Sequence, residues 1–192
     1  MKLLTHTAVG MFSGAVFYYL LNLDVGFILL AGFAAFLPDI DWRMQYSWRL
    51  GNVHRKVLHN VWVMGALAGI VYFLFRSPVL VLGVVVGFMS HLVADCFTVE
   101  GVYWLYPIGR KTERFHVKGS LSMSRPETAK IEGYIQTVLF TLTGFLFLVK
   151  QIEIDVFSME GLITLAVMLG VGFYLFKTLG KVIKRTIRRM GL

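Results

Sequence analysis

The stretch VLVLGVVVGFMSHLVADCF, residues 79–97, decides the fold of this chain. It is apolar for long enough to cross the hydrocarbon core of a bilayer as a helix, which takes about 20 residues. An imidazole and a carboxylate, His91 and Asp95, lie near its end. Ionisable side chains at that depth are energetically costly and usually serve a function. The stretch therefore predicts a membrane helix that contributes to a functional site.

The rest of the chain shares this apolar character. Of its 192 residues, 57% are hydrophobic and only 16% are charged, against roughly 25% charged residues in soluble domains. The mean hydropathy is +0.69. We predict an all-α, polytopic membrane helical bundle with four to five spanning helices plus one short helix. The apolar runs, of which the second is short and the fifth slightly short for a span, are Leu3–Leu21, Val25–Leu37, Val57–Phe75, Val79–Phe97, Tyr134–Val149 and Leu162–Leu179.

The net charge of +8 is concentrated in a few segments. Lysine and arginine are frequent in the loops at 39–56 and 98–130 and near the C-terminus, and rarer in the loops at 22–24, 76–78 and 150–160. Because these residues accumulate in cytoplasmic loops, the pattern predicts a multi-pass cell-membrane protein with both termini in the cytoplasm. Basic runs also occur in nucleic-acid-binding proteins, but these runs directly flank apolar helices, so we expect no specific nucleic-acid partner.

This topology brings the candidate functional side chains to one face of the membrane. Histidine nitrogens and carboxylate oxygens are common ligands of divalent metals, and the single cysteine, Cys96, excludes a cysteine-based zinc site. We therefore predict a metal site at the cytoplasmic interface. The candidate ligands, which all begin or end apolar runs on that side, are His6, Asp39, Asp41, His54, His59, His91 and Asp95.

The motifs differ in how strongly they point to a metal. His91 and Asp95 are four residues apart and share one face of a helix, which suits a chelating pair and equally a structural hydrogen bond. Asp39 and Asp41 follow Pro38, which ends the second run. By themselves the two aspartates are also typical of a helix cap. Beside other ligands, they favour a cation because two close carboxylates repel each other without one.

The remaining candidates surround the third run. His54 and His59 lie about 140° apart if both are helical, so either His54 precedes the helix or the two histidines face different metals. Arg55 has the planar fork that fits phosphate oxygens, although anchoring at the membrane surface explains it equally well. His6 is a lone histidine, and only its position at the same face makes it a candidate ligand.

Together these motifs resemble a known family. Pro38-Asp-Ile-Asp41, His54-Arg55 with His59, and His91 with Asp95 are similar to motifs of the membrane-bound, metal-dependent hydrolase family, whose bacterial members include the LexA-regulated inner-membrane protein YdjM. Thr98, Gly101 and Pro107 follow in the expected order, and the resemblance covers residues 1–110. The chain departs from the pattern at Asn60, where serine is common, and at Lys56, where a small residue is common.

The resemblance implies a metal-dependent hydrolase. The family is distantly similar to the all-helical, zinc-dependent phospholipase C group, in which histidines and aspartates hold up to three zinc ions. His91 and Asp95 match a helical H-x-x-x-D motif of that group. The resemblance supplies a reaction class and no substrate.

We therefore expect one domain, with the metal-site bundle and its cytoplasmic loop in residues 1–132 and further membrane helices with a basic tail in residues 133–192. The expected cofactor is a divalent metal, with Zn²⁺ as the first choice, and the expected number of ions is one to three. Asp41 is the expected proton acceptor and Arg55 the expected phosphate ligand. The expected substrate is a lipid-like phosphate ester in the membrane, such as a phospholipid or polyprenyl phosphate. Two alternatives stay open at this point, a cation or metal transporter and a haem-binding membrane protein.

Overall fold

The computed structural model describes residues 3–40, 57–106, 116–121 and 126–189. Within these ranges the chain is mostly helical, and its β structure consists of one pair of two-residue strands and an isolated bridge between Thr98 and Leu121, which confirms the all-α prediction. The strands β1 (Val102–Tyr103) and β2 (His116–Val117) form this pair, an antiparallel hairpin. The helices are α1 (Leu3–Leu20), α2 (Gly26–Ala34), the 3₁₀ turn η1 (Leu37–Asp39), α4 (Val61–Phe75), α5 (Pro78–Cys96), α6 (Pro126–Gln151) and α7 (Met159–Arg189).

Four of these helices are long and apolar enough to cross a membrane, namely α1, α5, α6 and α7. The prediction that the 57–75 run is long enough to span was wrong. Its helix, α4, has 15 residues and begins at Val61, because the Asn60 side chain caps it by accepting hydrogen bonds from the backbone N–H groups of Trp62 and Val63. The fifth run, by contrast, belongs to a 26-residue helix that starts at Pro126.

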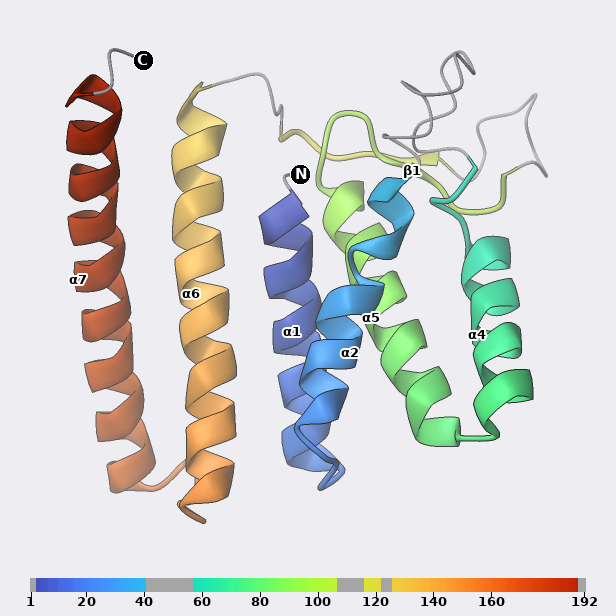
Figure 1. The fold of residues 1–192 in the computed structure, drawn as a ribbon, viewed down its shortest axis with the longest axis horizontal. Coiled ribbons are helices and arrows are strands. Elements are labelled where there is room, and N and C mark those ends of the chain that lie inside the picture. Colours follow the sequence, from blue (N-terminus) through green and yellow to red (C-terminus); the bar gives the residue numbers. More distant parts are fainter. Residues whose placement is uncertain (1–2, 41–56, 107–115, 122–125, 190–192) are drawn as a thin grey trace.

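The helices run alternately up and down, so that both ends of the chain lie at the same end of the bundle (Figure 1). Helix α2 packs against α1 and α5, and α4 packs on α5. On the other side α6 packs on α1, and α7 packs on α6. The hairpin β1–β2 lies at the end of the bundle where α1 begins and α5 ends (Figure 1).

Small residues bring α1, α2 and α5 close together. A Cβ atom added to Gly87 of α5 would lie 2.1 Å from the carbonyl oxygen of Ala31, and one added to Gly10 of α1 would lie 2.4 Å from the Cβ of Ala35. Ala31 and Ala35 of this contact are themselves fully buried. Small residues at membrane helix interfaces permit such close approach of backbones. The consequence is that the ends of three helices meet within the reach of single side chains.

Candidate metal centre

The last two turns of α5 supply the centre of a buried polar cluster. His91 and Asp95 are both fully buried, and His91 Nε2 lies 3.5 Å from Asp95 Oδ2. The i, i+4 spacing predicted that the two side chains share a helix face, and the structure confirms it. Behind them, Thr98 donates a hydrogen bond to the backbone carbonyl of Asp95 and accepts one from the N–H of Gly101. Gly101 has a φ of +63°, a left-handed conformation that favours glycine. This turn fixes the end of α5.

Helix α1 contributes His6 from its first turn. The ring is fully buried, and its Nε2 lies 3.2 Å from Asp95 Oδ1. It also stacks on His91, with ring centroids 3.8 Å apart and an interplanar angle of 24°. Sequence alone gave His6 only its position at the predicted face, and the structure places it among the other candidates.

Asp39 enters from the 3₁₀ turn η1. Helix α2 ends at Ala34, and Pro38 lies in the short turn that follows, as the position of the proline predicted. Asp39 Oδ1 lies 3.6 Å from His59 Nε2 and 3.8 Å from His91 Nε2. Its side chain is 19% exposed, whereas the other four members of the cluster are fully buried. Asp39 is therefore the most exposed member of the cluster.

His59 comes from the residues just before α4. Its Nε2 lies 3.6 Å from Asp95 Oδ2, and the ring contacts His91 edge-on. The Asn60 cap holds the start of α4 from one side. From the other side the N–H of Val61 donates to the carbonyl of Trp104, next to strand β1. This N-cap and the hairpin together fix the position of His59.

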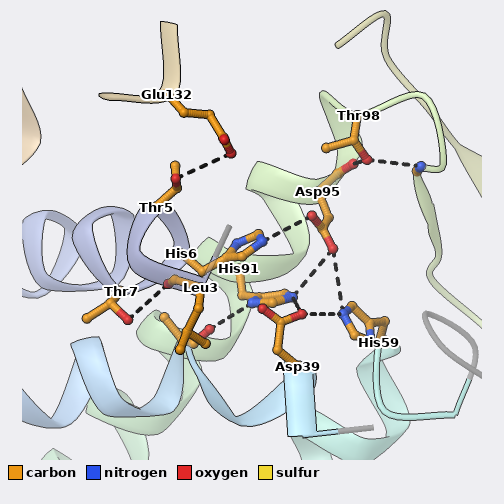
Figure 2. Close-up of polar contacts among 12 residues, drawn as sticks. Leu3, Thr5, His6, Thr7, Asp39, His59, His91, Asp95, Thr98 and Glu132 are labelled. Carbon is orange, nitrogen blue, oxygen red and sulfur yellow. Dashed lines mark hydrogen bonds and ion pairs between the residues drawn. The ribbon is translucent and has the colours of Figure 1, made fainter. Parts of the chain in front are cut away.

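The predicted convergence of imidazoles and carboxylates is present in the structure. Four segments that are far apart in the sequence bring five side chains to one place, as Figure 2 shows. Asp41, His54 and Arg55 lie outside the described residues. The five residues that meet, here called the His–Asp cluster, are His6, Asp39, His59, His91 and Asp95.

The tautomer of His91 tests whether this cluster fits a cation. His91 Nδ1 lies 2.7 Å from the backbone carbonyl oxygen of Ala35. A carbonyl oxygen only accepts hydrogen bonds, so Nδ1 carries the proton. The other nitrogen, Nε2, makes no hydrogen bond to any described residue and faces the carboxylates of Asp39 and Asp95. In a neutral ring Nε2 presents a lone pair, and metal-bound histidines are commonly oriented by such a bond from the second nitrogen. The cluster fits a cation between these groups.

Two overlapping sets of ligands have the spacing of a metal site. His6, Asp39 and His91 form one set, and His59, His91 and Asp95 form the other, with the ligand atoms of each set within 4.8 Å of one another. Nitrogen and carboxylate oxygen donors in this combination suit Zn²⁺ and related divalent ions. One buried carboxylate, Asp95, and one partly buried carboxylate, Asp39, also need compensating positive charge.

The stacking of His6 on His91 limits what a single ion can bind. An ion that an imidazole coordinates lies in the plane of that ring, at about 2.1 Å from the nitrogen for zinc. Two rings 3.8 Å apart and tilted by 24° have planes that do not meet within that reach. In-plane coordination of one ion by both His6 and His91 would therefore need one of the two rings to rotate, although their ligand atoms belong to one set. The same stacking leaves no space for a porphyrin between the two rings, which counts against haem ligation by this pair.

Sequence reasoning missed a polar contact between α1 and α6. Thr5 Oγ1 donates to Glu132 Oε1 at 3.4 Å and accepts from Gln136 Nε2 at 2.7 Å. Thr5 and Glu132 are buried, at 0% and 3% exposure. Residues 133–192 were expected only to add membrane helices, yet α6 reaches the α1 turn that carries His6 (Figure 2). The signal in the sequence was Gln136, a polar residue inside the predicted fifth run.

Comparisons with known proteins agree with a membrane location. Residues 1–180 match the family described as YdjM inner membrane protein. No curated protein and no solved structure matches the chain. The family match covers most of the sequence, and four helices are long and apolar enough to cross a bilayer. The chain is therefore a membrane protein and belongs to the YdjM inner membrane protein family.

Proposed function

We propose that this protein is a membrane-embedded, divalent-cation-dependent hydrolase of phosphate esters. The observation that carries the proposal is the His–Asp cluster, in which five side chains from four segments meet and the free nitrogen of His91 faces two carboxylates. Buried ionisable groups in membrane helices are rarely retained without a function.

In this proposal the His–Asp cluster holds one or more divalent cations, and Zn²⁺ is the ion that we expect. A bound divalent cation makes a water molecule acidic enough to serve as nucleophile at neutral pH and offsets negative charge on phosphoryl oxygens. Asp39 is the most exposed member of the cluster, and we therefore expect substrate to reach the cation beside it. Asp41 as proton acceptor and Arg55 as phosphate ligand stay predictions from the sequence, in line with their chemistry.

The geometry of the two stacked rings supports more than one cation. Asp95 directs Oδ1 to His6 and Oδ2 to His59 and His91. The two oxygens of Asp95 could therefore serve different ligand groups, one with His6 and the other with His59 and His91, if more than one cation bound.

The depth of the cluster supports a lipid-like phosphate ester as substrate. His6 is three residues inside the start of α1, and His91 is five residues before the end of α5. At 1.5 Å per residue this places the cluster roughly 5–8 Å inside the helix ends, near one face of the membrane, where the phosphate group of a lipid lies close by. A transporter would hold its ions nearer the bilayer midplane. The sequence segments 39–56 and 98–130, which connect helix ends at this end of the bundle, are rich in lysine and arginine and favour its placement at the cytoplasmic face.

The test is elemental analysis of the detergent-purified protein, combined with a phosphoesterase assay on bis-p-nitrophenyl phosphate and on phospholipid vesicles. We expect bound zinc or a similar ion, and its loss together with activity in Asp39→Asn and His91→Ala. His116→Ala is the matched control, since it removes a histidine outside the cluster. A wild-type protein that binds no divalent ion under any loading condition would refute the proposal, and ion-dependent flux in liposomes without hydrolysis would replace it with transport.

A further inference from the structure

The polar contact between α1 and α6 is built from three side chains. Thr5 has one hydroxyl hydrogen, which it donates to Glu132, and it accepts a hydrogen bond from Gln136. Glu132 and Gln136 are four residues apart and therefore lie on the same face of α6. All three side chains are buried or partly buried between α1 and α6.

Thr5 immediately precedes His6 in α1, so a contact that fixes Thr5 also determines the direction in which the His6 side chain points. Consecutive residues of a helix point about 100° apart. With Thr5 fixed on α6, His6 is directed to α5, where it meets Asp95 and stacks on His91. The rotation of α1 about its own axis therefore decides whether His6 reaches the His–Asp cluster.

The close packing of Gly10 and Gly14 on α2 restrains one side of α1, and hydrogen bonds to α6 restrain the other side. In a bilayer no hydrophobic driving force favours one helix contact over another, and directional hydrogen bonds between helices supply specificity. Two such bonds converge on Thr5, one from each of two turns of α6. The nearest alternative orientations of α1 would leave Thr5 and Gln136 with unsatisfied polar groups, which is costly when they are buried.

We propose that Thr5, Glu132 and Gln136 form a clamp that positions His6 for cation binding. The three are positioning residues, and His6 is the residue through which they act. The clamp gives helix α6, which contributes no residue to the His–Asp cluster, a role in its function. This inference rests on the proposed function only in that His6 binds a cation.

The experiment measures zinc affinity by competition with a chelator in the full-length, detergent-purified protein. Thr5→Val keeps the shape of the side chain and removes its hydroxyl, whereas Thr5→Ser keeps the hydroxyl and removes the methyl group. Changes in groups that orient a ligand typically cost ~10–100-fold in metal affinity. We expect Thr5→Val to weaken zinc binding about tenfold and Thr5→Ser to bind as wild type. Gln136→Leu removes the second bond at a distance from His6 and should weaken binding in the same direction.

A double-mutant comparison separates positioning from a general loss of structure. In a His6→Ala background, Thr5→Val should have no further effect on zinc affinity, because the side chain that the clamp orients is gone. The thermal midpoint of the chelator-treated protein serves as the folding readout for each variant. Equal zinc affinity of wild type, Thr5→Val and Gln136→Leu would overturn the clamp and leave the proposed function intact. So would an undiminished effect of Thr5→Val in the His6→Ala background. Absence of zinc from the wild type would instead refute the proposed function.

Discussion

The bundle has two regions that use their membrane helices differently. In α5, half of the membrane-spanning window is buried inside the protein, whereas in α7 only 6% of the corresponding window is buried. Helix α5 carries His91 and Asp95, packs against α1, α2 and α4, and approaches α2 through Gly87. Helix α7 packs on α6 and exposes large apolar side chains such as Val167 and Tyr174.

The difference shows that apolar composition has two separate causes in this chain. In α5 the apolar residues fill a protein interior around a polar cluster, and in α7 they suit a hydrocarbon solvent. Helix α6 lies between these two cases, because one end of it carries the clamp on α1. Matched substitutions in the two regions therefore distinguish a functional interior from a lipid-facing scaffold.

The largest effect is expected from removing a buried carboxylate in the first region. Asp95→Asn takes away the charge that contacts His6, His59 and His91, and we expect zinc affinity to fall by more than about 100-fold, since loss of an orienting group alone costs ~10–100-fold. Glu160→Gln, in the exposed first turn of α7, is the matched acid-to-amide control and should bind zinc as wild type. Equal affinities for the two variants, measured by chelator competition, would remove Asp95 from the site.

Removal of the cation itself is expected to have a smaller effect, which extends from the cluster to the stability of the whole first region. A ligand at 100 times its dissociation constant stabilises the folded state by ~2.7 kcal/mol, and its loss leaves two carboxylates close together in a buried cluster. Chelation should therefore lower the thermal midpoint and raise hydrogen exchange at the end of α5 while leaving exchange in α7 unchanged. Re-addition of zinc should reverse both changes. A uniform response of both helices would contradict the division into two regions.

Much of the first region could be predicted because its signals are local. The i, i+4 spacing of His91 and Asp95 fixes a shared helix face whatever surrounds it, and the lysine and arginine count predicted that all the candidate ligands lie at one end. Pro38 likewise predicted the turn that follows α2, although α2 itself already ends at Ala34. These inferences needed only helix geometry and the cost of charge in a membrane.

The parts that the sequence did not predict depend on distant partners or on a single cap. Thr5 and Glu132 are 127 residues apart, and one sequence carries no record that they meet. The predicted run began at Val57, but α4 begins only at Val61, because the Asn60 side chain caps its N-terminus. The close approach of α1 to α2 was not predicted, although Gly10 and Gly14 have the spacing of four that is typical of tightly packed membrane helices.

Glycine substitutions test the packing difference directly. In Gly87→Ala the new methyl group would lie 2.1 Å from the Ala31 carbonyl oxygen, so α2 and α5 must separate, and overpacking of this kind costs about 1–3 kcal/mol. In Gly170→Ala of α7 the methyl group has no described atom within 4 Å, and the higher helix propensity of alanine should stabilise the protein by up to ~1 kcal/mol. Thermal midpoints of the two variants should therefore move in opposite directions.

The zinc affinities of these two variants sharpen the test. Gly87 is one turn from His91, so a displaced α5 should also weaken zinc binding, whereas Gly170→Ala should leave it unchanged. If Gly87→Ala proved as stable as wild type and bound zinc equally well, the close contact between α2 and α5 would have no part in placing the His–Asp cluster.

The smallest effect is expected at the end of the bundle away from the cluster. Lys150, in the last turn of α6, donates to the carbonyls of Tyr18 and Leu23 at 2.7 and 3.0 Å, and its Nζ lies 3.7 Å from the centre of the Tyr18 ring. Lys150→Met should lower stability by about 1–2 kcal/mol, since these bonds to a charged donor satisfy carbonyls where α1 ends. Lys177→Met, on an exposed position of α7, is the matched control and should change stability by less than about 0.5 kcal/mol.

Neither substitution should alter zinc affinity, because α6 acts on His6 only through the clamp at its other end. A Lys150→Met protein with weakened zinc binding and an unchanged thermal midpoint would show that the two ends of α6 are coupled, and the separation of scaffold from site would then fail within this helix.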